Sequence, residues 1–300
     1  MKLLIILTPL IFMMSGLHSQ DNKDTECGLN DKFKHNTKDG KKWIYEDDES
    51  LFFTAPMSVN TDGAPTSYHP DDPWGSDGLA INTICNGANA LLPNGKVINY
   101  RNCKELVKAY KKSKSAGWDN PNKPRMEFYG IAKQGYVPCT IKTGKYKGYF
   151  VSTTSQVNDK SFSICEQERY LNALELPFII YPGHRKFINR GLGKKDIAIF
   201  YNPKKNILEY AIVGDKGPSR GLAEGSVFLG KTLNKRTRNP KNRKDTYKYA
   251  VKKVHALLLP NTSVEPPYTL EKIRREGKLA FENWGGRKRF DNCIDKYGNK

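Results

Sequence analysis

The sequence predicts a mainly β fold: a β-barrel with a few peripheral helices and a helical C-terminal extension. Short apolar runs rich in Val, Ile, Phe and Tyr recur between about residues 43 and 233, each followed closely by Gly, Pro or Asn. The 300-residue chain is 38% hydrophobic and 11% aromatic, which is enough to bury a core. From residue 234 onward the apolar spacing becomes helical.

The expected strands share β-branched and aromatic residues with a turn signal close behind them. They cover residues 51–55, 127–132, 149–153, 176–181, 196–201 and 208–213. Asn102 and Glu105 have the spacing of a capping box for a helix to about Ser113, and Ser226 is placed to cap another through Leu233.

Two apolar stripes at helical spacing predict the C-terminal extension over residues 234–300. Asp245 precedes the first stripe and Thr269 the second, which stops at Gly285 and Gly286. Isolated helices of this length are marginal in water, so both are expected to pack on the barrel. The packing residues are expected to be Val251, Val254, Leu258, Ile273, Phe281 and Trp284.

The N-terminus has the features of a secretory signal peptide over residues 1–19. Lys2 precedes an apolar run, and small residues follow up to Ser19. A polar arm over residues 20–42 and a barrel domain over residues 43–233 are expected after it. No apolar run reaches the roughly 18 to 20 residues that a transmembrane helix needs. We therefore expect a secreted or periplasmic protein.

Six cysteines, widely spaced and even in number, indicate disulfides in an exported chain rather than a zinc site. Six cysteines allow 15 pairings, among which the sequence does not choose. The expected pairs close two short loops and tie the chain ends: Cys85 with Cys103, Cys139 with Cys165, and Cys27 with Cys293.

Two carboxylates mark the most informative segment. Asp215 ends an apolar strand, and Glu224 lies nine residues later, where a Gly- and Pro-containing loop leads back into regular structure. Such a pair across one loop suits glycoside hydrolysis, which needs one carboxylic acid and one carboxylate. The structural alternative is a turn Asp and a Glu that favours a helix N-terminus.

Four segments in order resemble glycoside hydrolase family 75, the chitosanases, and together span about residues 58–233. They are Gly214-Asp215-Lys216-Gly217-Pro218 with Glu224-Gly225-Ser226; Asp62-Gly63-Ala64-Pro65 with Tyr68-His69-Pro70; residues 148–155; and residues 176–182. The resemblance implies a secreted, endo-acting, inverting hydrolase on a β-barrel of the double-psi type. It assigns the catalytic pair to Asp215 and Glu224. Lys216, the long basic region 73–118 and the C-terminal part depart from the family pattern.

Sequence neighbours suggest how the two roles are divided. Lys216 beside Asp215 would favour the ionised form, which suits a general base that activates water. Glu224 has no charged residue within three positions, and burial would raise its pKa, which suits a general acid. Their carboxyl groups are expected about 6.5 to 9.5 Å apart in one groove.

A second cluster, Asp62, Tyr68 and His69, is a candidate substrate-binding group for sugar hydroxyls or the amine of glucosamine. An Asx-type turn with two packed rings is the alternative. No GxSxG, HExxH, P-loop or GxGxxG motif occurs, and the expected mechanism needs neither a metal nor a cofactor.

The formal net charge of +19 is concentrated in basic runs, such as six Lys or Arg residues among residues 235–244. Lys235, Arg236, Arg238 and Arg243 are therefore expected to dock on an anionic envelope or polysaccharide. No aromatic residue interrupts that run, which disfavours a specific nucleic-acid partner. Besides the hydrolase, a non-catalytic carbohydrate- or envelope-binding protein on the same fold remains open.

Overall fold

The structure, a computed structural model, describes residues 26–299, so the signal peptide expected over residues 1–19 lies outside the described residues. The strands are β1 (Asp31–Thr37), β2 (Gly40–Glu46), β3 (Leu51–Asn60), β4 (Ala88–Leu91), β5 (Val97–Ile98), β6 (Arg125–Phe128), β7 (Lys133–Gln134), β8 (Val137–Pro138), β9 (Phe178–Pro182), β10 (Ile197–Asn202), β11 (Ile207–Gly217), β12 (Glu224–Ser226) and β13 (Val251–Leu259). The α-helices are α1 (Cys103–Ser115), α2 (Arg185–Ile188), α3 (Val227–Leu233), α4 (Arg243–Thr246), α5 (Leu270–Trp284) and α6 (Gly286–Tyr297).

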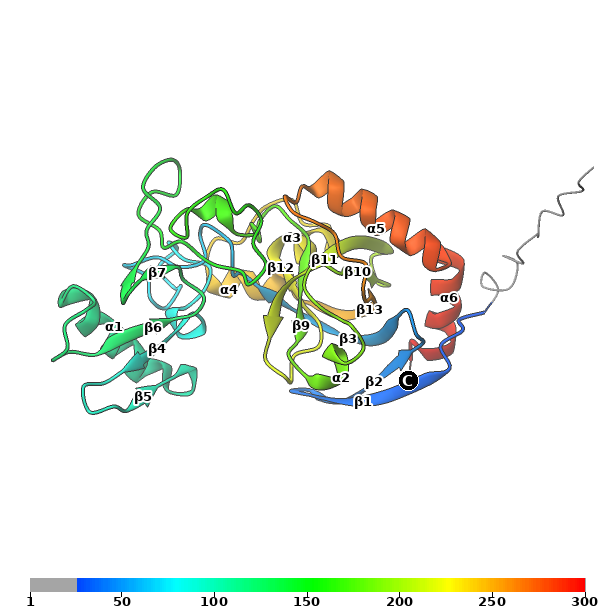
Figure 1. Ribbon diagram of the computed structural model, residues 1–300, viewed down its shortest axis with the longest axis horizontal. Helices are drawn as coiled ribbons and strands as arrows, with labels where there is room; N and C mark the ends of the chain where they lie inside the picture. Colours follow the sequence, from blue (N-terminus) through cyan, green and yellow to red (C-terminus); the bar gives the residue numbers. More distant parts are fainter. Residues whose placement is uncertain (1–25, 300) are drawn as a thin grey trace, which may run out of the picture.

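Six strands close into a barrel, which confirms the predicted mainly β barrel fold (Figure 1). The ring runs β3-β12-β9-β11-β10-β13 and returns to β3. The pairs β3–β12 and β9–β11 are parallel, and the other four are antiparallel. The β1–β2 hairpin extends the sheet from the edge of β3. Closure removes the free edges that would leave backbone groups unpaired.

Most barrel strands are buried on both faces. Phe53, Phe200 and Val213 belong to the interior cluster, whereas Phe52 and Leu257 join an outer cluster beneath α5 and α6. That outer cluster includes Ile273, Phe281 and Trp284, as expected for the second C-terminal stripe. Thr269 caps α5 by accepting a hydrogen bond from the Lys272 amide, and Gly285 ends the helix at φ 123°.

A smaller lobe is inserted between β3 and β9 and lies beside the barrel in Figure 1. Its three-stranded sheet β5-β4-β6 packs against α1, and β7 pairs with β8. Tyr110, Met126 and Phe128 are among the residues of its separate core. The chain therefore enters the lobe from β3 and returns to the barrel at β9.

The structure joins the six cysteines in the expected pairs. Cys85–Cys103 and Cys139–Cys165 close loops within the lobe, and Cys27–Cys293 links the N-terminal segment to α6. Disulfides of this number are typical of proteins that fold outside the reducing cytosol. None of the helices within residues 26–299 combines the length and hydrophobicity needed to cross a bilayer.

The prediction of a helix after Asp245 is wrong over most of its length. Only α4 and a 3-10 turn at Tyr247–Tyr249 precede β13, which pairs with β3 and β10 and closes the barrel. Val254 and Leu258 face the interior cluster, whereas Leu257 belongs to the outer one. Because both faces are buried, the strand shows no period-two alternation and mimics a helical stripe. The barrel therefore continues past residue 233.

The polar arm expected over residues 20–42 is also wrong from Asp31 onward. β1 and β2 form a hairpin that turns between Thr37 and Gly40, where Gly40 has φ 104°. Asp39-Gly40 is a common turn signal for a two-stranded hairpin. The lysines of this segment line its exposed side, and Phe33 packs inward.

Two smaller expectations fail in the lobe. Residues 149–153 form no strand but two isolated bridges, Phe150 with Thr140 and Ser152 with Ile131. The side chain of Asn102 does not cap α1, because a 3-10 turn over Tyr100–Asn102 leads directly into the helix. Ser226, by contrast, caps α3 as expected, through its Oγ and the Leu229 amide.

The basic run at residues 235–244 lies largely at the surface, but part of it is engaged in structure. Arg238 forms an ion pair with the buried carboxylate of Asp245. Arg236 Nε donates a hydrogen bond to the Lys248 carbonyl at 3.0 Å. Two of the four expected docking residues therefore also hold their own loop together.

Candidate active site

Asp215 and Glu224 lie on the two strands that flank β9. Asp215 in β11 pairs with Ile180 from one side, and Glu224 in β12 pairs with the same residue from the other. Neighbouring strands are about 4.8 Å apart, so the two Cα atoms are separated by roughly 10 Å. Side chains in register point to one face of a sheet, which places both carboxyl groups on the outer face with Ile180.

A β-bulge at Gly214 gives Asp215 this direction. The register shifts between Val213, which pairs with Ile179, and Asp215, which pairs with Ile180. Without the extra residue, position 215 would face the barrel interior, because a one-residue shift turns every side chain over. A Cβ at Gly214 would lie 2.9 Å from Phe178 Cβ, which cannot move aside like the end of a flexible side chain, so the bulge favours glycine at this position.

The half-buried carboxyl of Asp215 is held by main-chain donors. Its Oδ1 accepts hydrogen bonds from the Lys216 amide at 2.8 Å and the Ser155 amide at 3.2 Å. Lys194 Nζ donates to the Ser155 carbonyl at 2.9 Å and is the cation that acts on Asp215. Burial raises the pKa of Asp215, and these hydrogen bonds and the charge of Lys194 oppose the rise.

The side chain of Lys216 is not the cation that acts on Asp215, contrary to the prediction. Lys216 acts on Asp215 through its backbone amide, and its side chain lies against Gly183, where an added Cβ would meet Lys216 Cε at 2.9 Å. Lys194 provides the positive charge instead. Burial is the larger effect, so the net direction of the Asp215 pKa is upward rather than downward.

Glu224 is held from the end of β3. Its Oε1 accepts a hydrogen bond from Asn60 Nδ2 at 3.0 Å. Burial raises the pKa of Glu224 and the charge of Asp215 adds to this, whereas Asn60 and the ammonium of Lys38 oppose it. Lys38 belongs to the β1–β2 turn, and this hairpin is held beside the loop before Glu224 by His35 Nε2 and the Gly221 carbonyl, 3.0 Å apart.

Asp62 and Tyr68, two members of the second predicted cluster, are joined. The Tyr68 hydroxyl donates to Asp62 Oδ1 at 2.6 Å and accepts a hydrogen bond from Asn82 Nδ2 at 3.0 Å. Burial raises the pKa of Asp62 to about 8; the charges of Asp215 and Glu224 add to this, and the Tyr68 hydrogen bond opposes it. Asp62 therefore lies within electrostatic reach of both predicted catalytic carboxyls.

His69, the third member, lies apart from the carboxylates. Its Nδ1 accepts a hydrogen bond from the Asp71 amide at 3.1 Å, and its ring packs edge-on against Tyr149. Burial lowers the pKa of His69. These contacts are those of the packed turn that was the structural alternative.

Four residues that the sequence did not single out complete the site: Asn60, Ser155, Lys194 and Lys38. Ser155 lies within the third family-like segment, so that resemblance contained a signal for it. No sequence signal pointed to Lys38 or Lys194, because pairing between segments that are distant in the chain brings them to the carboxylates.

Comparison with protein-family models and with curated proteins found no match for this chain. Among residues 26–299, no group of three or more His, Cys, Asp or Glu side chains is arranged to hold a metal ion.

Proposed function

We propose that the chain is a glycoside hydrolase that cleaves inside glucosamine-containing, chitosan-like β-1,4 polysaccharides with inversion. The proposal rests on the strand register: Asp215 and Glu224 both pair with Ile180, one from each neighbouring strand. A Cα separation of roughly 10 Å leaves room for the 6.5 to 9.5 Å carboxyl spacing of inverting enzymes, about the space of one water. The resemblance to family 75 supports the substrate class.

The roles follow from the partners of each carboxyl. Asp215 accepts two backbone amides and lies near Lys194, and both favour its ionised form. It acts as the general base that takes a proton from the attacking water. Glu224 has a pKa raised by burial and by the charge of Asp215, so it holds the proton that it donates to the leaving glycosidic oxygen.

The basic surface does not prevent a cationic substrate from reaching this site. Asp62, Asp215 and Glu224 gather acidic groups at one place, whereas the lysines of the hairpin are spread along its exposed side. Charges more than about 8 Å apart are largely screened at physiological salt, so the distant lysines of the basic surface contribute little repulsion at the site. With the signal-like N-terminus and three disulfides, the enzyme would act after export.

Hydrolysis by the disulfide-bonded protein tests the proposal, with chitosans of graded acetylation and peptidoglycan as parallel substrates. Asp215→Asn and Glu224→Gln should each lower the release of reducing ends by about 10²- to 10⁴-fold. Glu105→Gln, which removes an exposed carboxylate of α1, is the matched control and should leave the rate unchanged. Proton NMR of fresh products should show the inverted anomer.

The same experiment separates the second candidate function. A wild-type protein that binds these polysaccharides without releasing reducing ends is a carbohydrate-binding protein on this barrel. Full activity of Asp215→Asn would contradict the catalytic assignment.

A further inference from the structure

The three carboxyl groups of the site have different electrostatic neighbours. Lys194 acts on Asp215 and Lys38 acts on Glu224. The groups that act on Asp62 are the phenol of Tyr68 and the carboxyls of Asp215 and Glu224, and Tyr129 on the lobe faces it as well. None of the ion pairs among residues 26–299 includes Asp62. Among carboxyls that share one site, a group with no nearby cation has the least to favour its ionised form, so Asp62 keeps a proton more readily than Asp215.

Asp62 is held rigidly at the end of β3. Its amide donates to Asn60 Oδ1 at 2.6 Å, and the same Asn60 side chain donates to Glu224. One side-chain amide therefore fixes the position of Asp62 relative to the predicted general acid. The next residue, Gly63, donates through its amide to Ser152 Oγ at 2.9 Å, in the segment that also carries Ser155.

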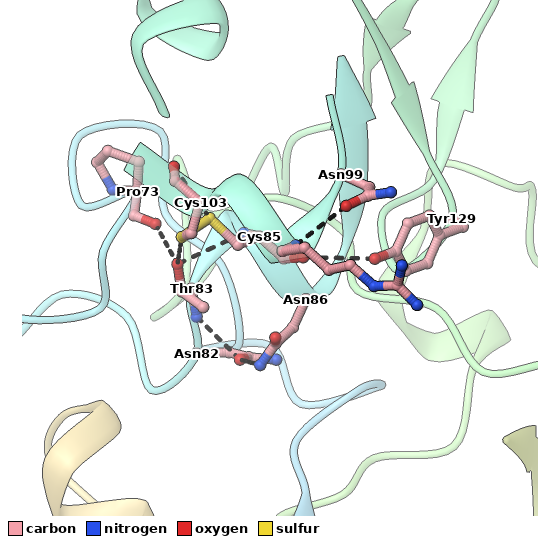
Figure 2. Close-up of a disulfide and its surroundings, with 9 residues drawn as sticks. Pro73, Asn82, Thr83, Cys85, Asn86, Asn99, Cys103 and Tyr129 are labelled. Carbon is pink, nitrogen blue, oxygen red and sulfur yellow. Dashed lines mark hydrogen bonds between the residues drawn. A yellow bond between two sulfur atoms is a disulfide. The ribbon is translucent and has the colours of Figure 1, made fainter. Parts of the chain in front are cut away.

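The donor to Asp62 is equally fixed. Tyr68 is only 1% exposed, and its hydroxyl lies so close to Gly87 and Gly130 that a Cβ at either position would approach it to within 3.0 Å. Asn82 Oδ1 in turn accepts hydrogen bonds from the Thr83 amide and from Asn86 Nδ2. Figure 2 shows Asn82, Thr83 and Asn86 beside the Cys85–Cys103 disulfide. The hydrogen bonds that lead to Tyr68 are therefore fixed in the cross-linked part of the lobe.

The remaining oxygen of Asp62 is the atom that is free to act. Oδ1 is occupied by Tyr68, and no group within residues 26–299 forms a hydrogen bond with Oδ2. The residue keeps partial exposure, as do Asp215 and Glu224. A partly buried carboxyl with one fixed and one unpartnered oxygen can present an O–H to a ligand bound at the site.

We propose that Asp62 works as a neutral carboxylic acid whose Oδ2–H donates a hydrogen bond to an uncharged oxygen of the bound sugar. This inference rests on the proposed function and refines its substrate class. The oxygen that would discriminate is the carbonyl of an N-acetyl group, because both kinds of sugar carry hydroxyls and an ammonium offers no acceptor to an O–H donor. The subsite at Asp62 therefore accepts a neutral or N-acetylated residue in preference to a protonated glucosamine.

Burial and the two neighbouring carboxyls support this proton-holding state, since they raise the pKa of Asp62 to about 8. Tyr68 opposes the rise, so it orients the carboxyl without ionising it. A carboxylate selected to bind an ammonium would instead be expected to have cationic or multiple amide partners that keep it charged.

The protonation state is tested without any need for turnover. In protein labelled with ¹³C at the Asp carboxyls, one resonance absent from Asp62→Asn should titrate with a midpoint near pH 8. Tyr68→Phe removes the opposing hydrogen bond and should move that midpoint upward. A midpoint below pH 6 would overturn the inference. Because this measurement needs only folded protein, it is independent of whether the chain is a hydrolase.

Ligand selection gives the second test, with chitotetraose and its fully N-acetylated counterpart as probes in binding titrations. Asp62→Ala should weaken binding of the N-acetylated probe about tenfold, the usual range for one neutral hydrogen bond. Asp62→Asn keeps an acceptor for Tyr68 and a donor for the sugar, so it should recover most of that loss. If Asp62→Asn instead lost binding of chitotetraose alone, Asp62 would be an ionised ammonium ligand and the inference would be wrong.

Discussion

The barrel and the lobe hold their parts of the site by different means. The barrel carries Asp215 and Glu224 on hydrogen-bonded strands, backed by interior residues such as Phe200 and Val213 that are fully buried, and no cysteine lies in a barrel strand. The lobe strands β4 to β8 have only two to four residues, and two of the three disulfides lie within the lobe. Figure 1 shows the two regions side by side.

The two regions therefore derive their rigidity from different interactions. A closed barrel positions a side chain through its ladder and core, because every strand has two neighbours. A small lobe buries too little apolar surface for the same effect and relies on covalent cross-links. Asp62 lies where the two regions meet: it is the second residue after β3 of the barrel and accepts a hydrogen bond from Tyr68 of the lobe.

The largest expected effect separates the two kinds of disulfide. In the chain-entropy account, loss of Cys27–Cys293, with a separation of 266 residues, costs about 5 kcal/mol, and loss of Cys85–Cys103, with a separation of 18, costs about 3 kcal/mol. The paired Ser variants should show this order in urea unfolding. In the lobe variant, hydrogen exchange should rise in the lobe while the barrel amides stay protected. Equal loss of protection in both regions would show that they unfold as one unit.

A smaller effect tests the junction at Asp62. The folded pKa near 8 lies above the unfolded value, so the native state holds a proton that the unfolded chain has lost between about pH 4 and 8. Stability is therefore lost as the pH rises through this window. Asp62→Asn removes the penalty and should be more stable than wild type at pH 9 by about 2 kcal/mol, allowing for solvent screening of a half-exposed group.

The control for this prediction is the same comparison at pH 4, where wild type and Asp62→Asn should have similar thermal midpoints. A variant that is destabilised to the same extent at both pH values would point to a packing defect instead.

The smallest expected effect concerns the basic run. Because Arg238 pairs with buried Asp245, Arg238→Ala should lower the melting temperature, while Lys235→Ala, at an exposed position, should leave it unchanged. The Arg238 pairing lowers the pKa of Asp245, so its contribution is present above about pH 4 and disappears in acid.

Neutralising Lys235, Arg236, Arg238 and Arg243 together should weaken binding to anionic vesicles, with turnover of short oligomers retained. Collapse of that turnover in a folded variant would place the run in the active site.

Short apolar runs of β-branched and aromatic residues bounded by turn signals, and the caps of two helices, were predictable from the sequence. The strands β9 and β10 were expected close to their observed bounds, β3 and β11 begin near their expected starts but run four to five residues further, and α3 and α5 begin after their expected caps. β13 was mistaken for a helix because burial on both faces removes the alternation that marks a strand. The β1–β2 hairpin was missed because its charged, exposed side dominates the composition, although Asp39-Gly40 signalled its turn.

By itself, the sequence determined that Asp215 lies near the end of a strand, that Glu224 begins the next element, and that Asp62 and Tyr68 share a turn region, since these are properties of neighbouring residues. Only the tertiary structure decided that Glu224 meets Asn60, that Lys194 replaces Lys216 as the cation near Asp215, and that the ring of His69 packs against Tyr149. The physical reason is that the β9 register and the Gly214 bulge set the direction of each carboxyl. Both depend on pairing between segments that are distant in the chain.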